Sequence, residues 1–256
     1  SGRVVIMDGA LGNTLMDFTM TGGLQISGEN SSDNPFTYSG GGMFLNLSSP
    51  ILTNISIIDN NADNGGGLSL YYSDPLLTNI YINENRAEGS GGGMFLQYSN
   101  PILSNVIISE NFAHTSGGLN LFYSNPILTN VIINGNTTDY SCGAMCANRS
   151  DPTLINVTIS ENTSGYYGGA SVHLYISEAV IKNTIIWNNM AESPWNVPLE
   201  SLEIFYYPHE QDPPSISYSD IQILDSDSEA YSLMQQGVGN INVDPLFNEP
   251  ATGDFT

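Results

Sequence analysis

The chain has 256 residues, which is enough to bury a large core in one or two domains. It carries 26 Asp and Glu against four Lys and Arg, a formal net charge of −22 at pH 7. This charge repels phosphate backbones and anionic lipid surfaces, so we exclude nucleic acid as a partner and expect an extracellular or high-salt setting. No apolar run approaches the roughly 18 residues of a membrane span, so we expect no membrane insertion. No leader peptide opens the chain, and we expect any secretion signal to lie outside this segment.

The first 40 residues are irregular. Two short apolar segments, 4–9 and 15–23, are interpreted as degenerate coils that precede a regular repeat. Asp17 is expected at the position that asparagine holds in each later coil. Residues 24–40 are then expected to be an insertion from the first regular coil.

A repeat of 25 to 27 residues follows, over residues 41–189. Each of its six copies contains a short phrase such as PILTN, preceded in most copies by a Gly-Gly-apolar segment. A fixed period of this length indicates a solenoid or another repeat array. The phrases begin at Pro50, Pro75, Pro101, Pro126, Pro152 and Ala179.

Each copy is predicted to form one coil of a right-handed parallel β-helix, an all-β fold. Segments such as 94–98 and 106–111 are short, rich in β-branched or aromatic residues, and bounded by turn-forming Gly, Asn-Pro or Asp-Pro. About three short strands and three turns fit each copy. Two aliphatic columns are expected to point inward: Leu52, Leu77, Leu103, Leu128 and Leu154, and Ile57, Ile82, Ile108, Ile133, Ile159 and Ile186.

Polar residues also recur at fixed positions, and we expect them to bond one coil to the next. Stacked coils place equivalent residues about 4.8 Å apart, within reach of side-chain amides and hydroxyls. Two asparagine columns and one serine column are predicted: Asn54, Asn79, Asn105, Asn130, Asn156 and Asn183; Asn60, Asn85, Asn111, Asn136, Asn162 and Asn189; and Ser48, Ser73, Ser99, Ser124, Ser150 and Ser177.

The repeat fades after Asn189. Residues 190–215 contain five prolines and are interpreted as a long loop, and segments 214–222 and 239–247 as one or two irregular final coils. No capping helix is evident. We therefore predict a single β-helix domain over residues 1–256, with irregular coils in 1–40, six regular coils in 41–189, and a loop and irregular coils in 190–256.

The Gly-Gly-apolar segments and the asparagine phrase resemble the right-handed parallel β-helix repeat proteins of bacteria. These are related in architecture to pectate lyases, and in repeat phrasing to the polymorphic outer-membrane proteins of chlamydiae. The tail SISYSDIQ followed by GNINVDPLF resembles large secreted bacterial surface proteins. The resemblance covers nearly the whole chain and implies the fold and a secreted or cell-surface location. The superfamily holds lyases, hydrolases and adhesins, and no catalytic motif of pectate lyases or polygalacturonases is visible to carry over.

An aromatic stripe is the first candidate site. Outward positions on the strand after the glycines carry one aromatic residue per coil in most coils, alternating between two columns, and sugar rings stack on such faces. The alternatives are packing between strands or cover by a loop. The proposed ligand-binding residues are Phe44, Tyr71, Phe95 and Phe122, with Trp195 of the long loop; a further column, Tyr72, Tyr98 and Tyr123, is interpreted as corner packing.

An acidic column is the second candidate. Stacked like charges destabilise a sheet, and Ca²⁺ would relieve the repulsion because it favours several carboxylate oxygens. The alternative is a row of solvated carboxylates that splay apart at a turn. The column is Asp59, Glu84, Glu110 and Glu161, interrupted by Gly135.

Candidate catalytic residues are few. Lys182 interrupts a Thr/Ser column and would be the base of a β-elimination lyase, whereas a glycosidase needs two carboxyl groups in a cleft. His209, Glu210 and Asp212 of the long loop are the other candidates. Cys142 and Cys146 either form a local disulfide or stay free, and we exclude a zinc site because no second pair or histidine cluster completes the pattern.

We therefore favour a non-catalytic extracellular or cell-surface scaffold used for adhesion or glycan contact. The alternative is a polysaccharide lyase or glycoside hydrolase of the pectate-lyase-like class. A polysaccharide or cell-surface glycan is the expected partner, and a polyanionic glycan would bind only through bridging cations. We expect Ca²⁺ as the one potential cofactor and a monomer for the isolated segment.

Overall fold

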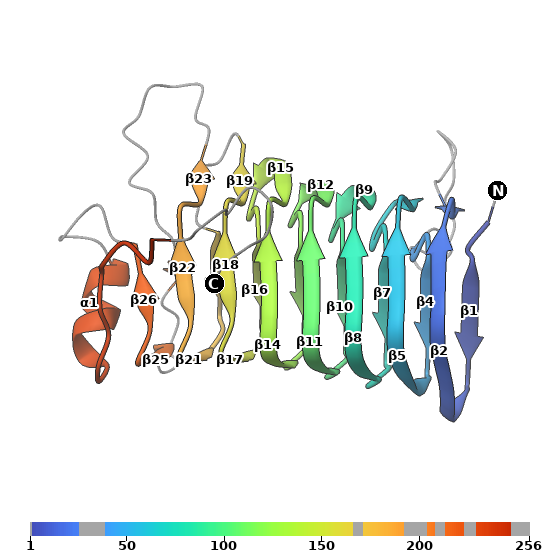
Figure 1. Cartoon of the computed structure of the whole chain (residues 1–256), viewed down its shortest axis with the longest axis horizontal. Helices are drawn as coiled ribbons and strands as arrows, with labels where there is room; N and C mark the ends of the chain where they lie inside the picture. The colour runs from blue at the N-terminus through green and yellow to red at the C-terminus, as the bar shows by residue number, and fades with distance from the viewer. Residues whose placement is uncertain are drawn as a thin grey trace.

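The computed structural model describes residues 2–25, 39–165, 171–191, 204–207, 213–222 and 229–246. They form the predicted parallel β-helix: each described coil except the last contributes strands to three parallel sheets, which run side by side along the molecule (Figure 1). The fold predicted from the repeat is therefore confirmed.

Sheet A contains the strands that follow the glycine pairs. Its eight strands pair in sequence order, each with the equivalent strand of the next coil, so that residues at equivalent repeat positions lie opposite one another. The strands are β1 (Val5–Asp8), β4 (Met43–Asn46), β7 (Leu68–Tyr71), β10 (Met94–Gln97), β13 (Leu119–Phe122), β16 (Met145–Asn148), β20 (Val172–Tyr175) and β24 (Ile204–Tyr207).

Sheet B contains the proline phrases. Its long strands divide in two beyond β14, where a bend at the asparagine position separates β17 from β18 and β21 from β22. The strands are β2 (Leu11–Thr21), β5 (Ser49–Ile58), β8 (Leu76–Asn83), β11 (Ile102–Ser109), β14 (Ile127–Asn134), β17 (Thr153–Ile155), β18 (Thr158–Ser160), β21 (Val180–Lys182), β22 (Ile185–Trp187), β25 (Ser215–Ser217) and β26 (Asp220–Ile221).

Sheet C closes the prism with short strands after the second asparagine column. Its register shifts within β12 against both neighbours, where the chain turns back toward sheet A. The strands are β3 (Leu24–Gln25), β6 (Asn61–Ala62), β9 (Arg86–Ser90), β12 (Phe112–Thr115), β15 (Thr137–Ser141), β19 (Thr163–Ser164) and β23 (Met190–Ala191).

The core lies between the three sheets. Every member of the predicted leucine and isoleucine columns is buried, together with the methionines and leucines of sheet A. Each aliphatic side chain packs on its equivalent in the coils above and below, so the repeat gives a dry interior along the whole prism.

The two asparagine columns have different environments. In the column of Asn85, Asn111 and Asn136, each side chain is buried and its Oδ1 accepts both the backbone N–H and the Nδ2–H of the preceding asparagine, at 2.9–3.1 Å. In the column that includes Asn105 and Asn130, the side chains are exposed, and each Nδ2–H donates to the Oδ1 of the preceding asparagine, at 3.1–3.3 Å. The serine column is buried, and each hydroxyl accepts the backbone N–H of the preceding serine.

The N-terminal segments form one coil. Residues 4–9 and 15–23 were interpreted as separate degenerate coils, but β1 lies in sheet A and β2 lies in sheet B of the same coil. Leu24–Gln25, assigned to the insertion, pairs with β6 as the third strand of that coil. Asp17 occupies the asparagine position as predicted, and its Oδ1 accepts a hydrogen bond from Asn54 Nδ2 at 2.9 Å.

A helix that the sequence pattern did not reveal covers the other end. Helix α1 (Glu229–Gln236) packs against β24 and β25, with Leu233 and Met234 buried, and lies at the end of the prism opposite β1 (Figure 1). The segments predicted as irregular final coils supply β25 and β26 before this helix and an isolated bridge between Asp220 and Ile241 after it. The helix thus shields the last coil from solvent.

Candidate functional site

A column of alternating amides and aromatic rings runs along the outer face of sheet A. It occupies the last residue of consecutive strands, where the parallel register places each residue opposite its equivalent. All members lie partly or fully at the surface. This amide–aromatic column consists of Asn46, Tyr71, Gln97, Phe122, Asn148 and Tyr175, with Tyr207 continuing it on β24.

A second row of rings lies at the corner between sheets A and B. Tyr72 stacks on Tyr98 with ring centroids 4.9 Å apart, and Tyr98 stacks on Tyr123 at 5.3 Å. The Arg149 guanidinium, at the same position of the next coil, lies over the Tyr123 ring at the end of this row, 5.5 Å from its centroid. We call these three residues the tyrosine ladder. The corner packing expected for them is confirmed, and Tyr72 and Tyr123 nevertheless remain 48% and 41% exposed.

The column and the ladder form one surface, which we call the aromatic corner. Tyr71 meets Tyr72 edge-on at 4.5 Å, and Phe122 meets Tyr123 edge-on at 4.7 Å. Because the ladder rings stack on one another, most of their faces are covered. Apolar edges, hydroxyls and the amide of Gln97 thus lie close together on one surface, as in many sites for uncharged polar ligands.

The backbone at the ladder does not favour tyrosine. Tyr72, Tyr98 and Tyr123 have φ of 46°, 52° and 50°, in the left-handed region that bulky side chains rarely adopt. Another left-handed position in each coil carries Asn in every regular copy, for example Asn105 with φ of 55°. The ladder position is also left-handed where it holds Leu47, Arg149 and Ile176, so this conformation belongs to the repeat. At the three tyrosines, ring stacking offsets part of its cost.

The residues of the predicted aromatic stripe lie in two columns and differ in exposure. Tyr71 and Phe122 belong to the amide–aromatic column, whereas Phe44 and Phe95 belong to the neighbouring column, opposite Ser69. Phe95 is half-buried, but Phe44 is only 8% exposed, with the Arg3 guanidinium 4.6 Å from its ring centroid. Phe44 is therefore not available to a ligand in this conformation, and Trp195 lies outside the described residues.

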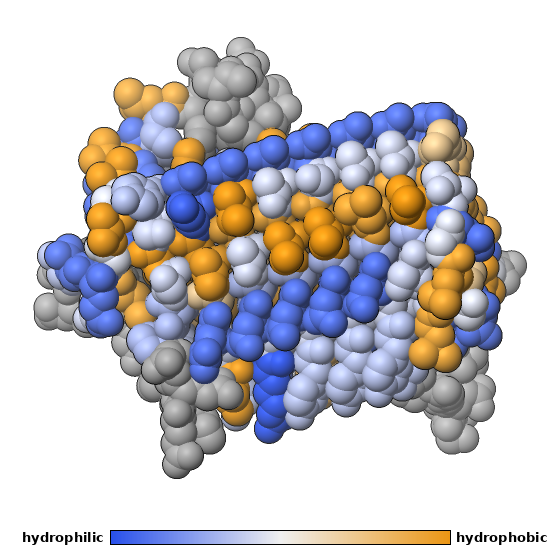
Figure 2. Space-filling view, turned by 90° about the horizontal axis from the view of Figure 1, so that it is seen from below, coloured by the Kyte–Doolittle hydropathy of each residue, from blue (hydrophilic) through white to orange (hydrophobic). Residues whose placement is uncertain are grey.

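An exposed aliphatic row lies on sheet B. It occupies one register position in consecutive coils. The sequence analysis did not identify this row, because its residues stand next to buried apolar residues in the proline phrase. Figure 2 shows a hydrophobic row between hydrophilic rows along this face of the prism. The row comprises Ile51, Leu76, Ile102, Ile127 and Val180, with Thr153 between the last two.

The acidic column stays at the surface. Burial and the charges of Glu161 and Glu84 raise the pKa of Glu110, whose carboxylate lies over Gly135 where a Cβ would otherwise stand. Gly135 therefore leaves room for Glu110 to move from its own coil toward the next. Within the described part of the chain, these carboxylates do not come together as a compact group of three or more oxygen ligands. The Ca²⁺ site remains a prediction.

The candidate catalytic residues are not brought together. Lys182 is exposed on sheet B, between Ile155 and Ser217 in the register. His209, Glu210 and Asp212 lie outside the described residues.

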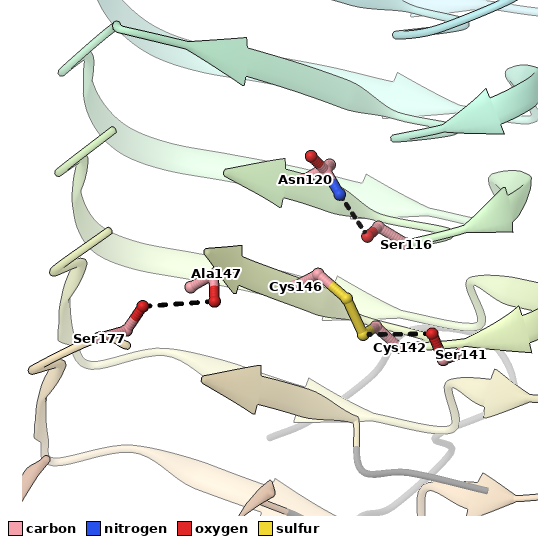
Figure 3. Close-up of a disulfide and its surroundings, with 7 residues drawn as sticks. All are labelled: Ser116, Asn120, Ser141, Cys142, Cys146, Ala147 and Ser177. Carbon is pink, nitrogen blue, oxygen red and sulfur yellow. Dashed lines mark hydrogen bonds between the residues drawn. A yellow bond between two sulfur atoms is a disulfide. The ribbon is translucent and has the colours of Figure 1, made fainter. Parts of the chain in front are cut away.

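Cys142 and Cys146 form a disulfide on the outer side of sheet A (Figure 3). In the preceding coil the same two positions hold Ser116 and Asn120, and Asn120 Nδ2 donates a hydrogen bond to Ser116 Oγ at 2.9 Å. The two positions therefore face each other across the turn in both coils, joined by a hydrogen bond in one and by a covalent bond in the other. The question of whether the cysteines pair is thus resolved in favour of a local disulfide.

Comparison with known proteins gives a family and no individual relative. A family model described as a right-handed beta helix region matches residues 67–198. No curated protein and no solved structure matches the chain. Among the described residues, no helix is sufficiently long and apolar to cross a membrane.

Proposed function

Because the chain belongs to the right-handed β-helix family, we propose that it is a non-catalytic extracellular or cell-surface scaffold that contacts carbohydrate through the aromatic corner. The observation that carries this proposal is the alternation of amides with aromatic rings over consecutive coils of one exposed face. The fold by itself supports only the scaffold.

The chemistry of the column suits a sugar chain. Gln97 lies between Tyr71 and Phe122, which are two coils apart, or about 9.6 Å at the usual spacing of strands. A pyranose offers C–H groups to an aromatic ring and hydroxyls to an amide, which both donates and accepts hydrogen bonds. A chain lying along the prism would meet these groups in turn.

The charge of the protein limits the kind of sugar. A formal net charge of −22 repels uronic acids and sulfated glycans unless cations bridge them. Arg149, next to Tyr123, is the single basic residue that contacts the ladder rings among the described residues. The proposal therefore favours a neutral polysaccharide or cell-surface glycan.

Titration calorimetry against a panel of neutral and uronic-acid polysaccharides tests the proposal. Tyr71→Ala or Phe122→Ala should weaken binding about five- to tenfold, since an aromatic contact contributes roughly 1–1.5 kcal/mol. Tyr81→Ala, which removes a half-buried tyrosine from sheet B, is the matched control and should bind as the wild type does. Equal binding by all variants, or binding to no glycan in the panel, would refute the role of the aromatic corner.

The lyase or hydrolase alternative is tested in the same panel. Absorbance from unsaturated chain ends, or new reducing ends, with and without Ca²⁺, would reveal turnover. Either signal, if lost in Lys182→Ala, would replace the non-catalytic proposal. No contact of Lys182 in the described structure favours this outcome over glycan contact alone.

A further inference from the structure

Three side chains that bind soft metals meet on the outer side of sheet A. Cys142 and Cys146 come from one coil, and His173 lies opposite Cys146 on the next strand because β16 and β20 pair in that register. Their sulfur atoms and a ring nitrogen of His173 all lie within 4.8 Å of one another. In the described residues no other set of three or more Cys, His, Asp or Glu gathers so closely.

One ring nitrogen of His173 has no hydrogen-bond partner. This atom, Nε2, is buried, although the ring packs edge-on against Phe205 with centroids 4.7 Å apart. The neutral form of an imidazole offers the lone pair of one nitrogen to a metal. Buried polar atoms normally have partners, and an unpartnered one calls for an explanation.

We propose that reduction of the Cys142–Cys146 disulfide converts this cluster into a zinc site. The two thiolates and the His173 imidazole are the three protein ligands, and water takes the fourth position. Histidine from the neighbouring coil thus completes a pattern that looked incomplete in the sequence, where His173 is 27 residues beyond Cys146 and only the coil register brings them together.

The redox step balances with a phosphine as reductant. The S–S bond accepts two electrons from phosphorus, which takes its oxygen from one water molecule, and the two protons of that water end on the two sulfurs. Zn²⁺ then displaces both thiol protons to the solvent, forms two Zn–S bonds and accepts the lone pair of His173. A thiol reductant gives the same dithiol and is itself oxidised to a disulfide.

The local geometry allows the sulfurs to separate. Tetrahedral zinc holds its sulfur and nitrogen ligands roughly 3.5–3.8 Å apart, given bonds of about 2.3 Å to sulfur and 2.0–2.1 Å to nitrogen. The Cα atoms of the cysteines are 5.6 Å apart, and the non-covalent Ser116–Asn120 pair shows that this turn exists without a covalent link. Ser141 Oγ lies 3.8 Å from Cys142 Sγ, where it can support a thiolate.

Cobalt titration of the reduced chain tests the proposal, because Co²⁺ takes the place of zinc and reports its ligands optically. The chain is reduced with a phosphine under anaerobic conditions, Co²⁺ is added, and Zn²⁺ then displaces it. We expect one equivalent of bound Co²⁺, with near-ultraviolet bands from two thiolates and visible bands of a tetrahedral ion. The oxidised chain should give neither.

Two variants separate this site from general attraction of cations to the acidic surface. The double variant Cys142→Ser/Cys146→Asn reproduces the Ser116–Asn120 pair of the preceding coil and sets the background. His173→Phe introduces phenylalanine, which already occurs at the same register position of sheet A as Phe95 and Phe205. Losing an outer partner of a metal ligand lowers affinity by about 10- to 100-fold, so losing the ligand itself should weaken binding by at least about tenfold and change the visible bands.

Three results would overturn the proposal. The reduced wild type could bind Co²⁺ no more tightly than the double variant does. His173→Phe could bind Co²⁺ with the affinity and visible spectrum of the wild type. Circular dichroism could show that reduction unfolds the chain. We expect the fold to survive, because the disulfide spans only four residues while the buried ladders and the core join every coil independently.

Discussion

At the scale of single residues, the same backbone conformation supports three different chemistries. Left-handed residues recur at four positions of the coil. One position holds glycine, serine or cysteine before the turn into sheet A, another holds the exposed asparagines, the third holds acidic residues in most coils, and the fourth holds the tyrosine ladder in three coils. Asparagine tolerates this conformation well, whereas glutamate and tyrosine do so at a cost. The side chains at the last two positions are therefore where interactions beyond the fold are to be sought.

The buried asparagines should contribute far more stability than the exposed ones. Asn111→Ala should lower the free energy of unfolding by about 1–3 kcal/mol, because the backbone N–H of Asn85 and the carbonyl of Ile82 lose their buried partner. Asn105→Gly, which keeps the left-handed backbone accessible and removes only an exposed amide, should change it by less than about 1 kcal/mol. Urea unfolding of both variants measures the difference in the free energy of unfolding. Equal effects would show that burial of the asparagine column does not matter for stability.

Glu110 should make stability depend on pH. Its pKa is raised in the folded chain, first by burial and then by Glu161 and Glu84, so the ionised carboxylate disfavours the folded state. Its stabilising contribution is present below the pKa of the unfolded chain and is lost as the pH rises through the higher folded pKa. Glu110→Gln should therefore raise the melting temperature at pH 7 and have little effect near pH 4. The gain should be small, on the order of 0.5 kcal/mol, because the side chain is exposed.

The same variant tests the predicted Ca²⁺ site. If the acidic column binds Ca²⁺, millimolar Ca²⁺ should raise the melting temperature of the wild type, chelator should reverse this, and Glu110→Gln should abolish most of the gain. Recovery of the same size with monovalent salt at matched ionic strength would mean that screening explains the effect and that the column binds no Ca²⁺.

At the scale of elements, each coil is held by its neighbours, and the last one is held by α1. In a solenoid, stability is close to a sum of terms between adjacent repeats, so a change at one end has a local effect. Leu233 and Met234 bury the apolar side of α1 against β24 and β25. The first coil, by contrast, leaves Ile6 and Leu11 59% and 74% exposed.

Removing the helix contact should loosen only the final coil. Leu233→Ala should cost roughly 2 kcal/mol in the local stability of the last coil, within the range for large-to-small changes in a core. Hydrogen exchange should accelerate in β25 and β26 and remain unchanged in β11 and β14. Faster exchange through all three sheets would contradict the local account and indicate that the whole prism unfolds as one unit.

The elements differ in how far the sequence predicted them. Period, strand positions, inward columns and ladders followed from the repeat, because stacking makes every coil repeat the same contacts. Helix α1 was missed because it occurs once and has no copy to align with. The strand Leu24–Gln25 was missed because its sequence differs from that of the equivalent strands in sheet C. The prediction of a loop over residues 190–215 was wrong for β23 and β24, which pair in sheets C and A. Cys146 and His173 were not connected, because their contact depends on the register between coils, and the burial of Phe44 depends on Arg3, which precedes the repeat.

At the scale of the whole molecule, charge governs association. Among the described residues β1 pairs only with β4, and the first coil has exposed apolar side chains, a combination that favours pairing with other strands. A formal net charge of −22 opposes such contacts at low ionic strength. The aliphatic row of sheet B is a second apolar surface, and the same repulsion should oppose association through it.

The isolated chain should therefore be a monomer at low salt and associate more as salt is added. Screening shortens the range of repulsion from about 30 Å at 0.01 M to about 10 Å at 0.1 M. Light scattering over a salt series measures this. A stable oligomer at low salt would show that an end or a face of the prism is an interface, and that assembly belongs to the function.

Hydroxyl-radical footprinting of the tyrosines, with and without the neutral polysaccharide that binds best in the panel, tests the central claim most directly. The account predicts that the glycan lowers modification of Tyr71, Tyr72 and Tyr123 at the aromatic corner and leaves Tyr81 on sheet B and Tyr231 on α1 unchanged. Protection of the sheet B tyrosine in place of the corner, or no protection at any tyrosine, would contradict it.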